Sequence, residues 1–281
     1  MSFYNKAVNY SLDESTAFKN ITDIHYNAFK SYENDENIHL TNKFVQKLIL
    51  SFDIFDDVQD KDNKRAPWSG DERQAINLGL ILLIDAFKEA HECNFINKKT
   101  ALDYIHLNLS NSIKGQYIDI QNRIKTPLEY INMCKSKSGS LVSLAALLGV
   151  LTTSTKHLTE IHSYCLDIGV AAQISNDIKD VINFEKKNDL SEKKISLPIL
   201  YLLYQYKGPS MVKDYFLGLV DYKEICMSKS MVIRQLYHSG ALNYAKQVKE
   251  KYMKQAKEKV NNLPIGSSKK LLIIKNLIDE I

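Results

Sequence analysis

Apolar residues recur at helical spacing along almost the whole chain of 281 residues. One buried helical face, with the spacing i, i+4, i+8, i+11, is formed by Phe44, Leu48, Phe52 and Phe55. Alternating β-branched runs, which would indicate strands, are absent from the sequence. The pattern therefore predicts an all-α fold, with further helices near residues 13–32, 71–92, 99–118, 127–152, 158–184, 196–206, 221–238, 239–261 and 267–280.

Residues that break helices are few and stand between these segments. Ten glycines and five prolines are about half the usual share of these residues, which argues against an all-β sandwich or a disordered chain. Pro127 and Pro198 each fit the first turn of a helix, where a missing N–H costs nothing. No linker rich in Pro, Gly or Ser divides the sequence, so we expect a single helical-bundle domain over residues 1–281. The acidic, Asn-rich segment 31–37 is predicted to be a solvated loop.

The net charge and the cysteines limit the partners and the compartment. A formal net charge of +4 is too mild to indicate nucleic-acid binding. The four cysteines stand far apart with no CxxC pair, which is typical of a reduced cytoplasmic protein and argues against a zinc site. The N-terminus lacks a secretion signal, and no transmembrane segment is predicted. We therefore expect a cytoplasmic protein and leave peripheral membrane contact open.

Four aspartates crowd the end of the first apolar face: Asp53, Asp56, Asp57 and Asp60. On a helix, Asp56 and Asp60 are one turn apart and Asp57 lies three residues before Asp60, so the carboxylates converge on one face. Like charges at this spacing repel, and the C-terminal end of a helix also disfavours anions. Mg²⁺ relieves both effects, because it commonly bridges one or two carboxylates to substrate phosphates. The plainer interpretation of this motif, taken alone, is a solvated acidic face.

A second acidic cluster repeats this arrangement much later in the chain. Asp177 and Asp180 are again three residues apart, and they follow an apolar face that includes Ile168 and Ile174. Two acidic helix ends that face each other across a helical bundle would form a metal site of the kind that bundles build. The pair of clusters therefore predicts a site for a diphosphate and Mg²⁺.

With both clusters in place, the chain resembles the trans-isoprenyl diphosphate synthases in the order and spacing of five motifs over roughly residues 40–260. The matching residues are Asp56, Asp57 and Asp60 followed by Arg65 (DDxxD and a basic residue), Gly115, Gln116 and Asp119 (GQxxD), Lys137, Ser138, Gly139 and Leu141 (KTGxL, with Ser for Thr), Gln173, Asn176, Asp177 and Asp180 (FQxxDDxxD, with Asn for the first Asp), and Asp189, Leu190, Lys194, Leu197 and Pro198 (DLxxGKxTLP).

The resemblance implies a helical bundle around a deep apolar cavity in which an allylic prenyl diphosphate ionises. The catalytic residues that it implies are Asp56, Asp57, Asp60, Lys137 and Lys194. The implied ligands of two or three Mg²⁺ ions are Asp56, Asp60, Asp177 and Asp180. The implied diphosphate-binding residues are Arg65, Lys137, Gln173 and Lys194, which would donate charge-assisted or neutral hydrogen bonds. The alternatives are ordinary surface charges for the basic residues and a structural hydrogen bond for each of Gln116 and Gln173. Family members are commonly dimers, so we expect a homodimer.

Two aromatic residues near the first cluster have two interpretations each. Phe52 lies one turn before Asp56, so its ring either limits the prenyl tail to geranyl or farnesyl length or is an ordinary core side chain. Trp68, the only tryptophan, either walls the acceptor site or simply packs.

The departures from the synthase pattern concern the second diphosphate site. Chain-elongating members bind isopentenyl diphosphate with a GKRxR segment, a His before the first aspartate motif and an RRG run. Here no such segment precedes Asp56, the His position is Ile49, and Ala66 and Pro67 follow Arg65. A diphosphate without cationic partners binds poorly, so the acceptor is predicted not to be isopentenyl diphosphate.

This combination resembles the ComQ family of bacterial pheromone-modifying isoprenyl transferases. The resemblance implies an acceptor tryptophan in a small precursor peptide and a role in quorum sensing. Three alternatives stay open: a short-chain prenyl diphosphate synthase, a terpene cyclase or allylic phosphatase, and an inactive subunit of a partner synthase. The cyclase motif NDxxSxxxE is poorly matched, because Asp180 replaces its Ser and Phe184 its Glu, with Glu185 one residue late.

Overall fold

The computed structural model describes residues 4–7, 9–10, 16–60, 66–183 and 189–281. Within these ranges the regular elements are all helical, so the prediction of an all-α fold is confirmed. The helices are α2 (Thr16–Phe29), α3 (Asp35–Asp60), α4 (Glu72–Glu92), α5 (Lys98–Gln121), α6 (Pro127–Cys134), α7 (Ser140–Leu151), α8 (Leu158–Ile182), α9 (Leu197–Tyr204), α10 (Met211–Phe216), α11 (Tyr222–Met227), α12 (Lys229–His238), α13 (Ala241–Asn261) and α14 (Ser267–Ile273). Two π-helical segments, Lys135–Gly139 and Ile274–Ile278, join α6 to α7 and follow α14.

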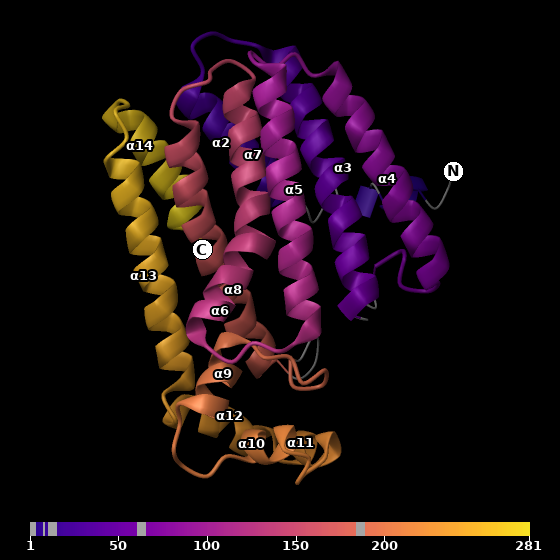
Figure 1. Ribbon diagram of the computed structural model, residues 1–281, viewed down its shortest axis with the longest axis vertical. Coiled ribbons are helices and arrows are strands. Elements are labelled where there is room, and N and C mark those ends of the chain that lie inside the picture. The colour runs from indigo at the N-terminus through magenta and orange to yellow at the C-terminus, as the bar shows by residue number, and fades with distance from the viewer. Residues whose placement is uncertain (1–3, 8, 11–15, 61–65, 184–188) are drawn as a thin grey trace.

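The long helices run side by side, and the short helices α10, α11 and α12 form a layer below one end of the bundle (Figure 1). Helices α3, α5 and α8 all end toward this layer, so their last turns, which carry the aspartate motifs, come to the same end of the molecule. The deep apolar cavity and the single domain over residues 1–281 stay predictions.

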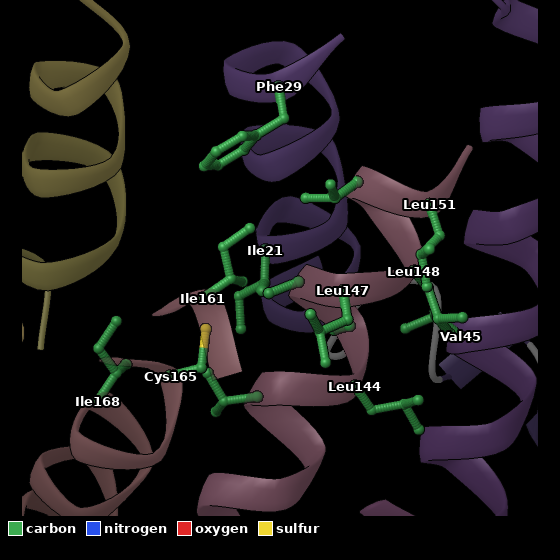
Figure 2. Close-up of a cluster of buried hydrophobic side chains, with 14 of the residues drawn as sticks. Ile21, Phe29, Val45, Leu144, Leu147, Leu148, Leu151, Ile161, Cys165 and Ile168 are labelled. Carbon is green, nitrogen blue, oxygen red and sulfur yellow. The ribbon is translucent and has the colours of Figure 1, made fainter. Parts of the chain in front are cut away.

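The core is built around α7, which is buried along nearly its whole length between α2, α5 and α8. Figure 2 shows Leu144, Leu147 and Leu148 of α7 packed among Ile21 of α2 and Ile161 of α8. A helix that is apolar all round is stable in water only when other helices surround it. The stretch Pro127–Leu151, which includes α7, is long and apolar enough to cross a membrane by length and composition, and 72% of its most apolar window is buried inside the bundle.

Two predictions about individual elements are wrong. The segment 31–37 is not a solvated loop throughout, because α3 already begins at Asp35 and Asn37 is buried. Asn37 donates to the carbonyl of Asn94 at 2.7 Å and accepts from its N–H at 2.8 Å, so the polar side chain joins the first turn of α3 to the connection between α4 and α5. The helix predicted at 221–238 is two helices, α11 and α12, which meet at Ser228.

A buried histidine, His25, links α2 to α8. Its Nδ1 lies 2.7 Å from the carbonyl of Ile21, which can only accept, so Nδ1 carries the proton. Its Nε2 then accepts from the hydroxyl of Tyr164, also at 2.7 Å. Burial lowers the pKa of His25 to about 4, although the hydrogen bond to Ile21 opposes the shift.

This depressed pKa predicts a loss of stability in mild acid. The unfolded chain takes up the proton near pH 6.5, whereas the folded chain does so only near pH 4. Stability is therefore complete above pH 6.5, falls as the pH drops through this window, and is lower by about 3 kcal/mol below it. Urea unfolding at several pH values should show this slope for the wild type and not for His25→Gln. An identical slope in both proteins would contradict the assignment.

Candidate functional site

Two lysines connect the aspartate motifs at the end of the bundle. The ammonium group of Lys137 lies 3.2 Å from Oδ1 of Asp56 and 2.7 Å from Oδ2 of Asp119. The ammonium group of Lys194 lies 3.3 Å from Oδ2 of Asp60 and 3.0 Å from the same oxygen of Asp119. The end of α5 thus holds both lysines against the acidic end of α3, and Asp119 is the carboxylate that they share.

The lysines keep their charge in this half-buried position. Desolvation would lower the pKa of Lys137 and of Lys194, but the aspartates around them raise both above the ordinary value. Burial likewise would raise the pKa of Asp119, and the two lysines lower it. The three groups are therefore ionised together, and two cations stand at the acidic end of α3.

Lys137 reaches this place because three helices approach unusually closely. It lies in the π-helical segment Lys135–Gly139, and such segments often occur at functional sites. A Cβ on Gly115 of α5 would lie 2.2 Å from the backbone nitrogen of Lys137, and one on Gly169 of α8 would lie 2.3 Å from Cα of Gly139. Only glycine at these positions lets α5 and α8 enclose the segment.

Gly115→Ala is therefore expected to destabilise the protein by about 3 kcal/mol or more, because backbone atoms cannot move aside as a side chain can. Gly70→Ala is the matched control, since no atom of the described residues lies within 4 Å of its added Cβ. Urea unfolding of both variants measures the difference. Equal stabilities would show that the close approach does not constrain Lys137.

Lys194 is positioned by the C-terminal cap of α5. Asn122 adopts a left-handed conformation there, and its side-chain amide binds the backbone on both sides of Lys194. Its Nδ2 donates to the carbonyl of Lys193 at 2.6 Å, and its Oδ1 accepts from the N–H of Ile195 at 2.8 Å. One helix end therefore fixes both the backbone of Lys194, through Asn122, and its ammonium group, through Asp119.

The second acidic motif lies deeper than the first. Asp177 is 5% exposed, and its two oxygens accept from the hydroxyl of Tyr130 at 2.5 Å and from Nε2 of Gln173 at 2.8 Å. Burial raises the pKa of Asp177, while these hydrogen bonds and the charge of Lys194 oppose the shift. Since Lys194 also contacts Asp60, both acidic motifs lie within electrostatic reach of the same ammonium group.

Asp189 adds a further buried carboxylate on this side. Burial and the nearby charge of Asp177 raise its pKa to about 8, although Lys194 and Ser196 oppose the shift. Among the described residues its Oδ2 has no hydrogen-bond partner. A buried carboxylate oxygen without a donor is costly unless a proton or a cation accompanies it.

The remaining predicted residues are placed as follows. Phe52 is half-buried against the main core, Asp180 is half-buried at the end of α8, and Gln116 donates to Oε1 of Gln59 at 3.1 Å. Asp57 accepts from the indole N–H of Trp68 at 2.9 Å. Arg65, Phe184 and Glu185 lie outside the described residues.

Three residues of the site, Asp119, Asn122 and Tyr130, have no role that the sequence pattern indicates. Asp119 is the last residue of the GQxxD motif, which marks its position in the sequence. The spacing of the motifs does not show that two lysines from later segments contact it. Asn122 and Tyr130 carry no motif and act through the folded geometry alone.

The oxygen donors fit Mg²⁺ that is shared with a substrate. Among the described residues, no three His, Cys, Asp or Glu side chains converge closely enough to hold a metal ion by themselves. Mg²⁺ is usually bound by one or two carboxylates, waters and substrate phosphates, and not by an all-protein cage. Separate carboxylates on α3 and α8 agree with that mode of binding.

The polyprenyl synthetase family model matches residues 21–216. The tryptophan prenyltransferase ComQ of Bacillus subtilis strain 168 is 28% identical over 265 residues, which cover 92% of this chain and 86% of ComQ. The crystal structure of a geranylgeranyl pyrophosphate synthase has a TM-score of 0.83 at 18% identity and covers 99% of this chain and 92% of that one. A polyprenyl synthase from Caulobacter crescentus, solved with calcium and isoprenyl diphosphate, has a TM-score of 0.76 at 19% identity and covers 92% of this chain and 81% of its own. Both solved structures agree with the helical fold described above.

Proposed function

Since the chain belongs to the polyprenyl synthetase family and is a prenyl-transferring enzyme, we propose that it ionises an allylic prenyl diphosphate, geranyl or farnesyl, and transfers the prenyl group to a tryptophan of a small precursor peptide. The observation that carries the proposal is the lysine pair on Asp119, which holds two cations at the acidic end of α3, with Lys194 also within electrostatic reach of Asp177 on α8. Quorum sensing is the proposed role, because the ComQ resemblance supports it.

Each residue of the site has a proposed role in binding or ionising the allylic diphosphate. Lys137 and Lys194 bind the diphosphate oxygens and stabilise the negative charge that develops as the allylic C–O bond breaks. Asp119 would keep both ammonium groups in place if Asp56 and Asp60 held Mg²⁺ in place of the lysines. When bound, Mg²⁺ supplies further positive charge for the leaving diphosphate, and we assign its binding to Asp56, Asp60, Asp177 and Asp180. Arg65 and Gln173 stay proposed partners of the diphosphate, and Phe52 the proposed limit on its tail.

The acceptor is proposed to carry no phosphate. Ile49, which stands where elongating synthases have a His, is buried in the main core, so it offers the acceptor neither charge nor a hydrogen bond. An indole ring is an electron-rich nucleophile that can attack an allylic cation directly. The likeness to a tryptophan prenyltransferase supports the same choice.

A product assay tests the acceptor. The enzyme, Mg²⁺ and farnesyl or geranyl diphosphate are incubated with a Trp-containing peptide or with isopentenyl diphosphate, and the products are read by mass spectrometry. We expect a prenylated peptide and no lengthened diphosphate, whereas a Trp→Phe peptide serves as the control and should stay unmodified. A longer allylic diphosphate would instead support the alternative, a short-chain prenyl diphosphate synthase, with which the match to the polyprenyl synthetase family also agrees.

We also propose a homodimer that uses the exposed face of α4. Large apolar side chains recur there at helical spacing, among them Ile76, Leu80 and Ile84, and Ile84 is 69% exposed. An apolar stripe of this kind is typical of a surface that another molecule covers.

All four cysteines are free, which supports the proposed cytoplasmic location.

Light scattering after size exclusion should give twice the chain mass for the wild type and a single chain mass for Ile84→Glu. Leu128→Glu is the matched control, because Leu128 on α6 is equally exposed, at 69%, and should leave the dimer intact. A monomeric wild type would contradict this use of α4.

A further inference from the structure

Trp68 contacts the acidic motif directly. It lies between α3 and α4, is 3% exposed, and donates its indole N–H to Oδ2 of Asp57 at 2.9 Å. An indole nitrogen can only donate, so the direction of this hydrogen bond is fixed. Trp68 is the only tryptophan in the chain, and a hydrogen bond to the first acidic motif goes beyond both interpretations that its sequence position offers, a wall of the acceptor site and a packing residue.

The indole ring is held firmly in place. Trp68 belongs to a cluster of buried side chains that includes Leu50 and Ile54 of α3 and Leu78 of α4. Tyr10 packs edge-on against it, with ring centroids 5.4 Å apart. A donor fixed by packing on several sides stays aimed at the same oxygen.

Asp57 carries its charge among other carboxylates of the same helix. It is adjacent to Asp56 and three residues before Asp60, so its neighbours repel its charge. A neutral N–H stabilises the carboxylate in one orientation without adding a positive charge that would compete with a bound cation.

We propose that Asp57, which stands between the proposed ligands Asp56 and Asp60 on α3, also takes part in binding magnesium and diphosphate, and that Trp68 is the residue that positions its carboxylate. The inference rests on the proposed function. It predicts that the indole N–H contributes to the binding of Mg²⁺ with a diphosphate and that Trp68 emission reports this binding.

The first test removes the donor and keeps an aromatic ring. Trp68→Phe should bind Mg²⁺ with inorganic pyrophosphate about tenfold more weakly than the wild type, the effect expected for losing one hydrogen bond to a charged group. Tyr4→Phe is the matched control, because Tyr4 packs in the same cluster and donates to Asp85 at 2.7 Å, outside the acidic motif. Titration calorimetry measures the affinities, and circular dichroism measures the helix content.

The second test uses Trp68 fluorescence and needs no change to the indole. Asp57→Ala should shift the emission of Trp68, and adding Mg²⁺ with pyrophosphate should shift it in the wild type but not in Asp57→Ala. If Trp68→Phe loses its helix content, these emission measurements decide.

The outcomes separate the two proposals. If folded Trp68→Phe binds Mg²⁺ with pyrophosphate within twofold of the wild-type affinity, the role of Trp68 alone is overturned. The same conclusion follows if the emission of Trp68 changes neither in Asp57→Ala nor on addition of Mg²⁺ with pyrophosphate. A wild type that fails to bind Mg²⁺ with pyrophosphate overturns the proposed function and this inference together.

Discussion

Asp56→Ala and Asp177→Ala are each expected to lower Mg²⁺-dependent prenyl transfer by about 10³-fold or more while leaving the helix content unchanged. Asp56 stands at the acidic end of α3 beside Lys137, and Asp177 lies buried at the end of α8. The proposed site needs both sides, because we assign the binding of Mg²⁺ to carboxylates of both helices. A steady-state assay over a range of Mg²⁺ concentrations measures the loss.

The control for these variants is Asp167→Ala. Asp167 lies on the same helix as Asp177, is also buried, and pairs with Lys259 at 2.5 Å, so its removal likewise takes away a buried carboxylate and its polar contact. It belongs to neither acidic motif, and turnover should stay within a few-fold of the wild type. Full activity in either Asp56→Ala or Asp177→Ala would remove the metal assignment.

The second large effect is expected from the lysines. Lys137→Met and Lys194→Met keep most of the side-chain volume but remove the charge, and each should lower kcat by about 10² to 10³-fold, as the loss of one donor to a developing anion does. Because both lysines share Asp119, Asp119→Asn should weaken both at once. Asp119→Asn should therefore lower turnover more than either single lysine variant does, because it removes the carboxylate that holds both ammonium groups in place.

Lys259→Met is the control for the lysine variants, since Lys259 on α13 also pairs with a buried aspartate, Asp167 on α8, but belongs to none of the motifs. Stopped-flow or quench-flow measurement of the first turnover separates the chemical step from product release. Wild-type rates of this step in both Lys137→Met and Lys194→Met would contradict the proposed diphosphate contacts.

Much of the fold could be predicted because the helices depend on residues that are close together in the sequence. The apolar spacing of Phe44 and Leu48 marks a buried helical face, and Thr126 caps the helix that begins at Pro127. The segment 31–37 could not be predicted this way. Its polar composition indicates a loop, and only the distant backbone of Asn94 gives Asn37 its buried partners.

The sequence shows the motifs of the candidate site, but it does not show which of their side chains contact one another. Charge and spacing point to Asp56, Asp60 and Asp177, because repulsion within a helix is a local property. The meeting of Lys137 and Lys194 on Asp119 depends on how three helices pack, and that depends in turn on the absent Cβ of Gly115. The hydrogen bond from Trp68 to Asp57 has the same origin in tertiary structure.

The number of diphosphates that one chain binds tests the account most directly. Titration calorimetry with a farnesyl analogue that carries a non-ionising thiodiphosphate, in the presence of Mg²⁺, should give one molecule per chain. Isopentenyl diphosphate added to that saturated complex should produce no further binding heat. Two diphosphates per chain, or equally tight binding of the analogue without Mg²⁺, would contradict a single magnesium-dependent site between α3 and α8.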